Sequence, residues 1–168
     1  RPVVPIFLMT WAYRDHGVKN STDLGTVDEF TAAVREGYRA YAAALDGAMG
    51  VSTSVTRIAP VGMAFYHVYN TNLTLWERLF YVDGLHPSPL GSYLEACVLY
   101  RTIFGAMPAK VGRREDVTAL WARARRMMPP EEVQLDLPSV EDCGLLWDVA
   151  ELVCQREGLA LNGGGFGD

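Results

Sequence analysis

The chain has 168 residues and a mass of 18.6 kDa, and 49% of its residues are hydrophobic while 21% are charged. This apolar fraction is enough for the core of one domain and argues against a disordered chain. The net charge of −5 leaves no basic surface for nucleic acid, and no apolar run is long enough to cross a bilayer. We therefore expect neither a nucleic-acid partner nor a membrane span.

The first half of the chain alternates predicted strands with predicted helices. The apolar run 3–10 predicts a short buried strand, which a polar loop follows. Thr26 and Glu29 have the spacing of a capping box, which predicts a helix from there to about Asp46. The run 55–61 predicts a second strand.

The second half is predicted to be mainly helical. Ser88 as an N-cap and Pro89 at the first helical position predict a helix that ends near Gly105. Two amphipathic helices are expected over residues 115–128 and 139–157. Strands that alternate with helices indicate an α/β fold with a parallel sheet, followed by a helical part.

The three cysteines, Cys97, Cys143 and Cys154, have neither CxxC nor metal-ligand spacing. All three lie on the apolar faces of predicted helices, so we expect buried thiols. Asp15 and His16 have no spacing that favours a metal site either. We therefore expect neither a metal nor a cofactor.

The strongest chemical signal is the pair Asp83 and His86 in a turn-rich segment. A histidine is a useful base near neutral pH when an acceptor holds its other ring nitrogen. An aspartate three residues earlier on a tight turn can orient the imidazole, which gives two members of a nucleophilic triad. The alternative is an aspartate that caps its own turn beside an exposed histidine.

Residues 81–96, with the sequence YVDGLHPSPLGSYLEA, resemble the last conserved block of the SGNH (GDSL-type) hydrolases. In that family an Asp-x-x-His-Pro motif supplies the acid and base of a Ser-His-Asp triad. Further segments similar to one branch of the family occur in the expected order at residues 9–15, 37–38 and 59–65.

The resemblance implies a three-layer α/β/α sandwich with a parallel sheet, of which residues 1–108 would be the C-terminal part. Residues 109–160 are expected to pack on it as a helical extension, and the glycine-rich tail 161–168 to be disordered. The implied activity is that of a serine ester hydrolase of the acyl or acetyl esterase class. Its triad would use His86 as the base and Asp83 as the acid, with no cofactor.

The chain departs from the family in lacking the Gly-Asp-Ser-like block that carries the nucleophile. It also opens directly on a strand-like run, without an initiator Met or a leader. We therefore expect a C-terminal portion that is inactive alone and whose nucleophile lies upstream. Trp11, Tyr13 and Arg14 are candidates for the substrate pocket, and the substrate class is a small-molecule or carbohydrate ester.

Two alternatives stay open at this point. One is a non-catalytic carbohydrate-binding or scaffold module on the same fold. The other is a chain that begins near Arg1 and whose sheet a homodimer partner completes, because an unpaired sheet edge is avoided in soluble proteins.

Asn20-Ser-Thr and Asn72-Leu-Thr match the acceptor pattern for N-glycosylation. They favour secretion or the lumen of the secretory pathway, with the cytoplasm as the alternative.

Overall fold

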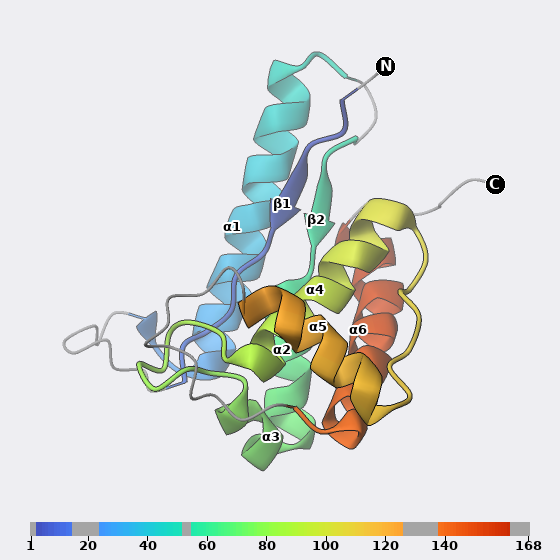
Figure 1. The fold of residues 1–168 in the computed structure, drawn as a ribbon. Coiled ribbons are helices and arrows are strands. Elements are labelled where there is room, and N and C mark those ends of the chain that lie inside the picture. Colours follow the sequence, from blue (N-terminus) through green and yellow to red (C-terminus); the bar gives the residue numbers. More distant parts are fainter. Residues whose placement is uncertain (1–2, 15–23, 52–54, 126–137, 162–168) are drawn as a thin grey trace.

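The computed structural model describes residues 3–14, 24–51, 55–125 and 138–161. They form two short strands and six helices (Figure 1). In chain order these are β1 (Ile6–Leu8), α1 (Val27–Ala48), β2 (Arg57–Ala59), α2 (Val61–Thr71), α3 (Leu73–Arg78), α4 (Pro89–Phe104), α5 (Arg114–Arg125) and α6 (Val140–Leu161).

The two strands pair in parallel, with Phe7 opposite Ile58 at the centre of the register. The fold is therefore broadly α/β, as predicted, although helices predominate; the larger three-layer sandwich stays a prediction. Both strands are shorter than the apolar runs 3–10 and 55–61 predicted. A strand extends only as far as a neighbouring strand accompanies it. Before β1, the side chain of Val3 is exposed to solvent, and after β2 the chain turns directly into α2.

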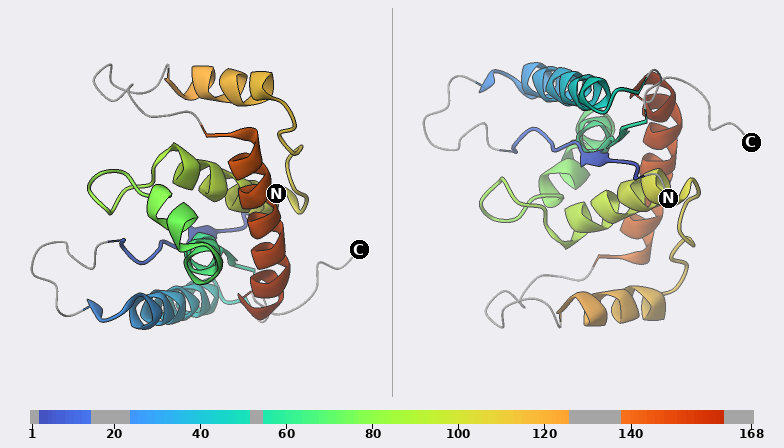
Figure 2. Two further views of the ribbon diagram at one scale, coloured as in Figure 1. Left: turned by 90° about the horizontal axis from the view of Figure 1, so that it is seen from below. Right: turned by 90° about the horizontal axis from the view of Figure 1, so that it is seen from above.

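Helices cover both faces of the strand pair. Phe7 and Ile58 point to α1, where the ring of Phe7 meets the ring of Tyr38 edge-on. Ile6 and Leu8 point to the opposite face and pack on the larger core, to which α4 and α6 belong. Both views in Figure 2 show α1 and α4 on opposite sides of the strands. This alternation is the side-chain pattern of a strand that is buried on both faces.

Helix α1 begins at the predicted capping box. The hydroxyl of Thr26 accepts from the backbone N–H of Glu29 at 3.2 Å, and the Glu29 carboxylate accepts from the N–H of Thr26 at 2.8 Å. At the other end, the buried Asp46 accepts from both the N–H and the hydroxyl of Thr56, at 3.0 and 2.6 Å. The C-terminal end of α1 is thereby tied to the start of β2.

Helix α4 has the predicted ends. Ser88 is its N-cap, Pro89 stands in its first turn, and Gly105 closes it in the left-handed conformation that glycine adopts without strain. The helix contributes to the main core together with α2 and α6. The largest fully buried side chains of that core belong to Phe65, Leu79, Leu94 and Leu146.

The C-terminal part contains the two predicted helices. Helix α6 starts after Ser139, whose hydroxyl caps the N–H of Asp142, and it packs against α4, α2 and β2. The last residues of the predicted helix 115–128 and residues 162–168 of the predicted tail lie outside the described residues. The predicted start of the disordered tail at residue 161 was wrong by one residue, because Leu161 is still part of α6. Among the helices that the structure describes, none has the length and apolar character needed to cross a membrane.

Candidate functional site

The Asp-x-x-His-Pro segment forms a closed loop between α3 and α4. At its base, the N–H of Tyr81 donates to the carbonyl of His86 and that of Ser88 to the carbonyl of Leu79, both at 2.8 Å. At its tip, Gly84 has a φ of 70°, a conformation that favours glycine, and donates back to the carbonyl of Tyr81. The loop is thus held by its own backbone.

Inside this loop the Asp83 carboxylate contacts His86 with both oxygens. Oδ2 lies 2.6 Å from Nδ1 of the imidazole. Oδ1 accepts from the backbone N–H groups of Leu85 and His86, at 2.9 and 3.0 Å. Because an ionised carboxylate only accepts, Nδ1 must carry the proton of this bond and Nε2 of the neutral ring has a free lone pair.

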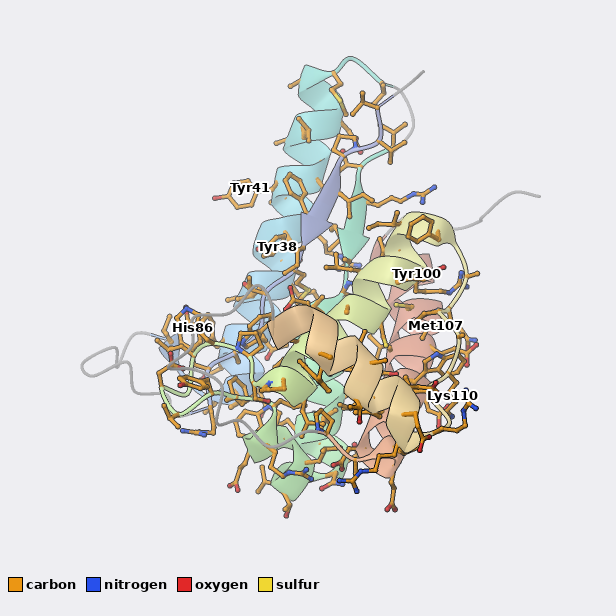
Figure 3. The ribbon with its side chains drawn as sticks, viewed as in Figure 1. Tyr38, Tyr41, His86, Tyr100, Met107 and Lys110 are labelled. Atoms are coloured by element: carbon orange, nitrogen blue, oxygen red, sulfur yellow. The ribbon has the colours of Figure 1, made fainter. Side chains whose placement is uncertain are left out.

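The imidazole lies at the surface, with 77% of the His86 side chain exposed (Figure 3). The hydrogen bonds from the His86 ring and from the N–H groups of Leu85 and His86 lower the pKa of Asp83 from 3.8 to about 2. Asp83 is therefore ionised throughout the neutral pH range. It can orient the ring and stabilise an imidazolium, which are the tasks of the carboxylate in a triad.

The segment after β1 contacts this loop from the side. The indole N–H of Trp11 donates to the carbonyl of Leu85 at 3.0 Å, and the backbone N–H of Arg14 donates to the carbonyl of Gly84 at 3.0 Å. The Trp11 ring stacks on Phe65 at 4.6 Å between centroids. Two of the three residues predicted to line a substrate pocket thus brace the backbone of the His86 loop.

Tyr13, the third residue of that set, lies differently. Its ring meets Phe30 of α1 edge-on, with centroids 5.2 Å apart. The structure therefore brings Trp11 and Arg14 to the Asp83–His86 loop, and gives Tyr13 a packing contact with α1.

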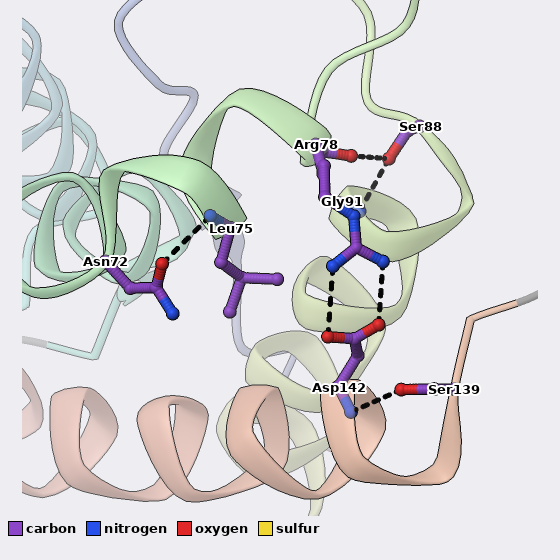
Figure 4. A network of polar contacts seen from close by, with 7 residues as sticks. All are labelled: Asn72, Leu75, Arg78, Ser88, Gly91, Ser139 and Asp142. Atoms are coloured by element: carbon purple, nitrogen blue, oxygen red, sulfur yellow. Dashed lines mark hydrogen bonds and ion pairs between the residues drawn. The ribbon is translucent and has the colours of Figure 1, made fainter.

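The described serines do not complete a triad with His86. Ser88 donates to the carbonyl of Arg78 at 2.6 Å and accepts from the N–H of Gly91, while the hydroxyl of Ser139 caps α6 (Figure 4). Within the described ranges, no serine hydroxyl is hydrogen-bonded to the His86 ring. Three further serines, Ser21, Ser52 and Ser54, lie outside these ranges.

Sequence reasoning missed the contacts that anchor the C-terminal end of the loop. The Arg78 guanidinium binds the Asp142 carboxylate with two hydrogen bonds of 3.2 and 2.7 Å, across 64 residues of chain (Figure 4). Since the Arg78 carbonyl also accepts from Ser88, the loop end is linked through α3 to the start of α6. No local sequence signal marks this link.

The cysteines offer no alternative nucleophile. Cys97 and Cys143 are buried, as predicted, whereas the prediction of a buried thiol was wrong for Cys154, which is half-buried; all three are free thiols. Burial raises the pKa of Cys97 and of Cys143 to about 11 and that of Cys154 to about 12. At neutral pH these thiols are protonated and therefore weak nucleophiles.

The remaining predicted sites concern glycosylation and metal binding. Asn72 is exposed and caps α3 through Oδ1, 3.0 Å from the N–H of Leu75, so this bond does not use the Nδ2 that a glycan would modify. Asn20, Asp15 and His16 lie outside the described residues. In the part of the chain that the structure describes, no group of three or more His, Cys, Asp or Glu side chains could hold a metal ion.

Comparisons of the chain with protein-family models, curated proteins and solved structures returned no match.

Proposed function

We propose that residues 1–168 belong to a serine ester hydrolase of the SGNH type, in which His86 is the general base and Asp83 orients it. One observation carries this proposal. The Asp83 carboxylate lies 2.6 Å from Nδ1 of His86 while two backbone N–H groups fix its other oxygen, which leaves Nε2 exposed and able to accept a proton. A carboxylate that only capped its own turn would not need the contact with the ring.

The reaction follows from these roles. A serine from a segment outside residues 1–168 attacks the acyl carbonyl of the ester, and Nε2 of His86 takes the hydroxyl proton. The ester C–O bond then breaks, the same proton passes to the leaving alcohol, and an acyl-serine remains. Water, activated in turn by His86, releases the acid and restores the serine. Asp83 stays ionised and stabilises the imidazolium in both steps.

The geometry of the strands supports a nucleophile from such a segment. The N–H of Arg57 donates to the carbonyl of Pro5 and that of Met9 donates to the carbonyl of Ala59, so these parts of β1 face β2. Backbone polar groups alternate along a strand, so those of Ile6 and Leu8 face the opposite edge. No strand among the described residues pairs with that edge.

A further parallel strand at this edge would end on the side where β1 leads into Trp11, which holds the His86 loop. Active sites of open parallel sheets lie at the carboxyl ends of the strands. A serine that followed such a strand would be on the same side of the sheet as Nε2 of His86. The Met9–Trp11 region therefore supports the proposal independently of the Asp83–His86 contact.

The test is ester turnover by the native protein that contains residues 1–168. Wild type is expected to hydrolyse p-nitrophenyl acetate, and His86→Ala to lower kcat/KM by about three orders of magnitude or more, since triad members act as a unit. His67→Gln is the matched control, because His67 lies in α2, outside the loop, and its ring should be silent in catalysis.

Two results would overturn the proposal. Turnover that survives His86→Ala would remove the base from the mechanism. A wild-type protein that binds oligosaccharide but turns over no acetyl ester would instead favour the non-catalytic carbohydrate-binding module.

A further inference from the structure

We propose that Trp11 is a positioning residue for His86, which sets the orientation and tautomer of the imidazole by holding the peptide group that precedes it. That Trp11 matters for catalysis rests on the proposed function. Its effect on the His86 imidazole does not depend on that function.

Trp11 is itself rigidly held. Just before it, Met9 is fully buried, and its backbone donates to the carbonyl of Ala59 in β2 and accepts from the N–H of Gly62 in α2, both at 3.0 Å. The indole then lies nearly parallel to the buried ring of Phe65, with an interplanar angle of 11°. The indole N–H is thus a fixed donor.

The group that this donor holds is the peptide between Leu85 and His86. Its carbonyl, on Leu85, accepts from the indole of Trp11 at 3.0 Å, while its N–H, on His86, donates to Oδ1 of Asp83 at 3.0 Å. A trans peptide group is planar, with its C=O and N–H on opposite sides. Trp11 and Asp83 therefore hold the two ends of one rigid unit, and holding the carbonyl aims the N–H at Asp83.

The preceding peptide repeats the arrangement. The carbonyl of Gly84 accepts from the backbone N–H of Arg14 at 3.0 Å, and the N–H of Leu85 donates to the same Oδ1 of Asp83 at 2.9 Å. Two consecutive peptide groups thus link the segment after β1 to one carboxylate oxygen. The other oxygen, Oδ2, is left in position for Nδ1 of His86.

Of the two hydrogen bonds that the segment after β1 donates to these peptide groups, only the bond from Trp11 comes from a side chain. A substitution of Trp11 can therefore remove it. If the indole N–H is lost, the Leu85–His86 peptide keeps its bond to Asp83 but loses the donor that fixes its carbonyl, so the orientation of this peptide and of the Asp83 carboxylate is less tightly set. The imidazole then samples the Nε2–H tautomer, in which Nε2 cannot accept a proton.

The experiment measures the tautomer of His86 from the ¹⁵N chemical shifts of its ring in the neutral form. Wild type is expected to show mainly the Nδ1–H tautomer. In Trp11→Phe, which keeps an aromatic ring against Phe65, the ratio of Nδ1–H to Nε2–H should fall about fivefold, the usual net effect of one hydrogen bond. Replacing Trp11 by β-(3-benzothienyl)-alanine, which keeps the bicyclic shape and lacks the N–H, should do the same if the phenylalanine variant does not fold.

Trp147→Phe is the matched control. The indole N–H of Trp147 also donates to a backbone carbonyl, that of Pro108, at 2.8 Å, but on the α6 side of the molecule. Its loss should leave the His86 shifts unchanged, which separates a local positioning effect from a general loss of stability.

The outcomes distinguish this inference from the proposed function. An unchanged His86 tautomer in a folded Trp11 variant would overturn the positioning role, even if ester turnover depends on His86. A shifted tautomer in a protein without esterase activity would support the positioning role and leave the hydrolase proposal refuted.

Discussion

The carboxylate of Asp83 holds both the ring and the backbone of His86: Oδ2 lies 2.6 Å from Nδ1, and Oδ1 lies 3.0 Å from the backbone nitrogen. The Asp83 side chain therefore holds both the backbone of His86 and the orientation of its imidazole ring. A turn that needed only a cap would use one oxygen. The two-oxygen contact is the feature that separates this loop from an ordinary capped turn.

The Asp83 carboxyl is predicted to titrate with a pKa of about 2 instead of 3.8, since the His86 ring and two backbone N–H groups stabilise its ionised form. A pKa lowered by folding stabilises the protein above the unfolded value near 3.8, and this stabilisation is lost as the pH falls through about 2. A titration that follows the ¹³C shift of the Asp83 carboxyl against pH measures this pKa.

His86→Ala removes the largest cause of this shift and should raise the Asp83 pKa. Asp142 serves as the control: burial raises its pKa, but hydrogen bonds from Arg78 and Ser139 outweigh this and keep it low in both proteins. An Asp83 midpoint near 3.8 in the wild type would refute the described contact.

Gly91→Ala is predicted to destabilise the protein by about 1–3 kcal/mol, the usual cost of forcing atoms into packed structure. A Cβ at Gly91 would lie 2.2 Å from the carbonyl oxygen of Leu79, which also accepts from Ser88 at the base of the loop. Urea unfolding measures the change.

Gly37→Ala is the control for this substitution, because Gly37 lies inside α1 and a Cβ there meets no atom within 4 Å. It should stabilise the protein by about 0.5–1 kcal/mol through helix propensity. Equal stabilities of the two variants would contradict the close approach of Gly91 to Leu79.

Asp46→Ala should lower the free energy of unfolding by about 1–3 kcal/mol, because it leaves the buried N–H of Thr56 without its acceptor. Asp46→Asn keeps an acceptor oxygen and should cost less. Chemical denaturation of both variants tests the link between α1 and β2. An Asp46→Ala variant as stable as wild type would show that this link carries no stability.

The Arg78–Asp142 pair should show a coupling energy of about 0.2–1 kcal/mol in a double-mutant cycle, because half of the Arg78 side chain is exposed and solvent screens the charges. The Lys110–Asp148 pair, in which the carboxylate is more exposed, should couple more weakly. The reverse order would contradict the anchoring role assigned to Arg78.

The features that could be predicted from sequence are those made by residues close together in the chain. The capping pair Thr26 and Glu29 and the N-cap Ser88 satisfy their bonds within three residues, so their spacing alone reveals them. The same holds for Asp83 and His86, whose contact spans three residues.

What could not be predicted depends on distant chain segments. Trp11 and Leu85 are 74 residues apart, and the sequence marked Trp11 only as a candidate for a substrate pocket. The predicted strands were too long for a related reason. An apolar run shows which residues can be buried, but not how far a partner strand accompanies them.

The most direct test of the hydrolase proposal is to treat the native protein with a fluorophosphonate and to locate the adduct by intact mass and peptide mass spectrometry. We predict one labelled serine, in a segment that precedes residue 1 and follows a strand, and no labelling in His86→Ala. A wild-type protein that stays unlabelled, or labelling that is indifferent to His86, would contradict the assignment of His86 as the general base of a serine esterase and of Asp83 as the carboxylate that orients it.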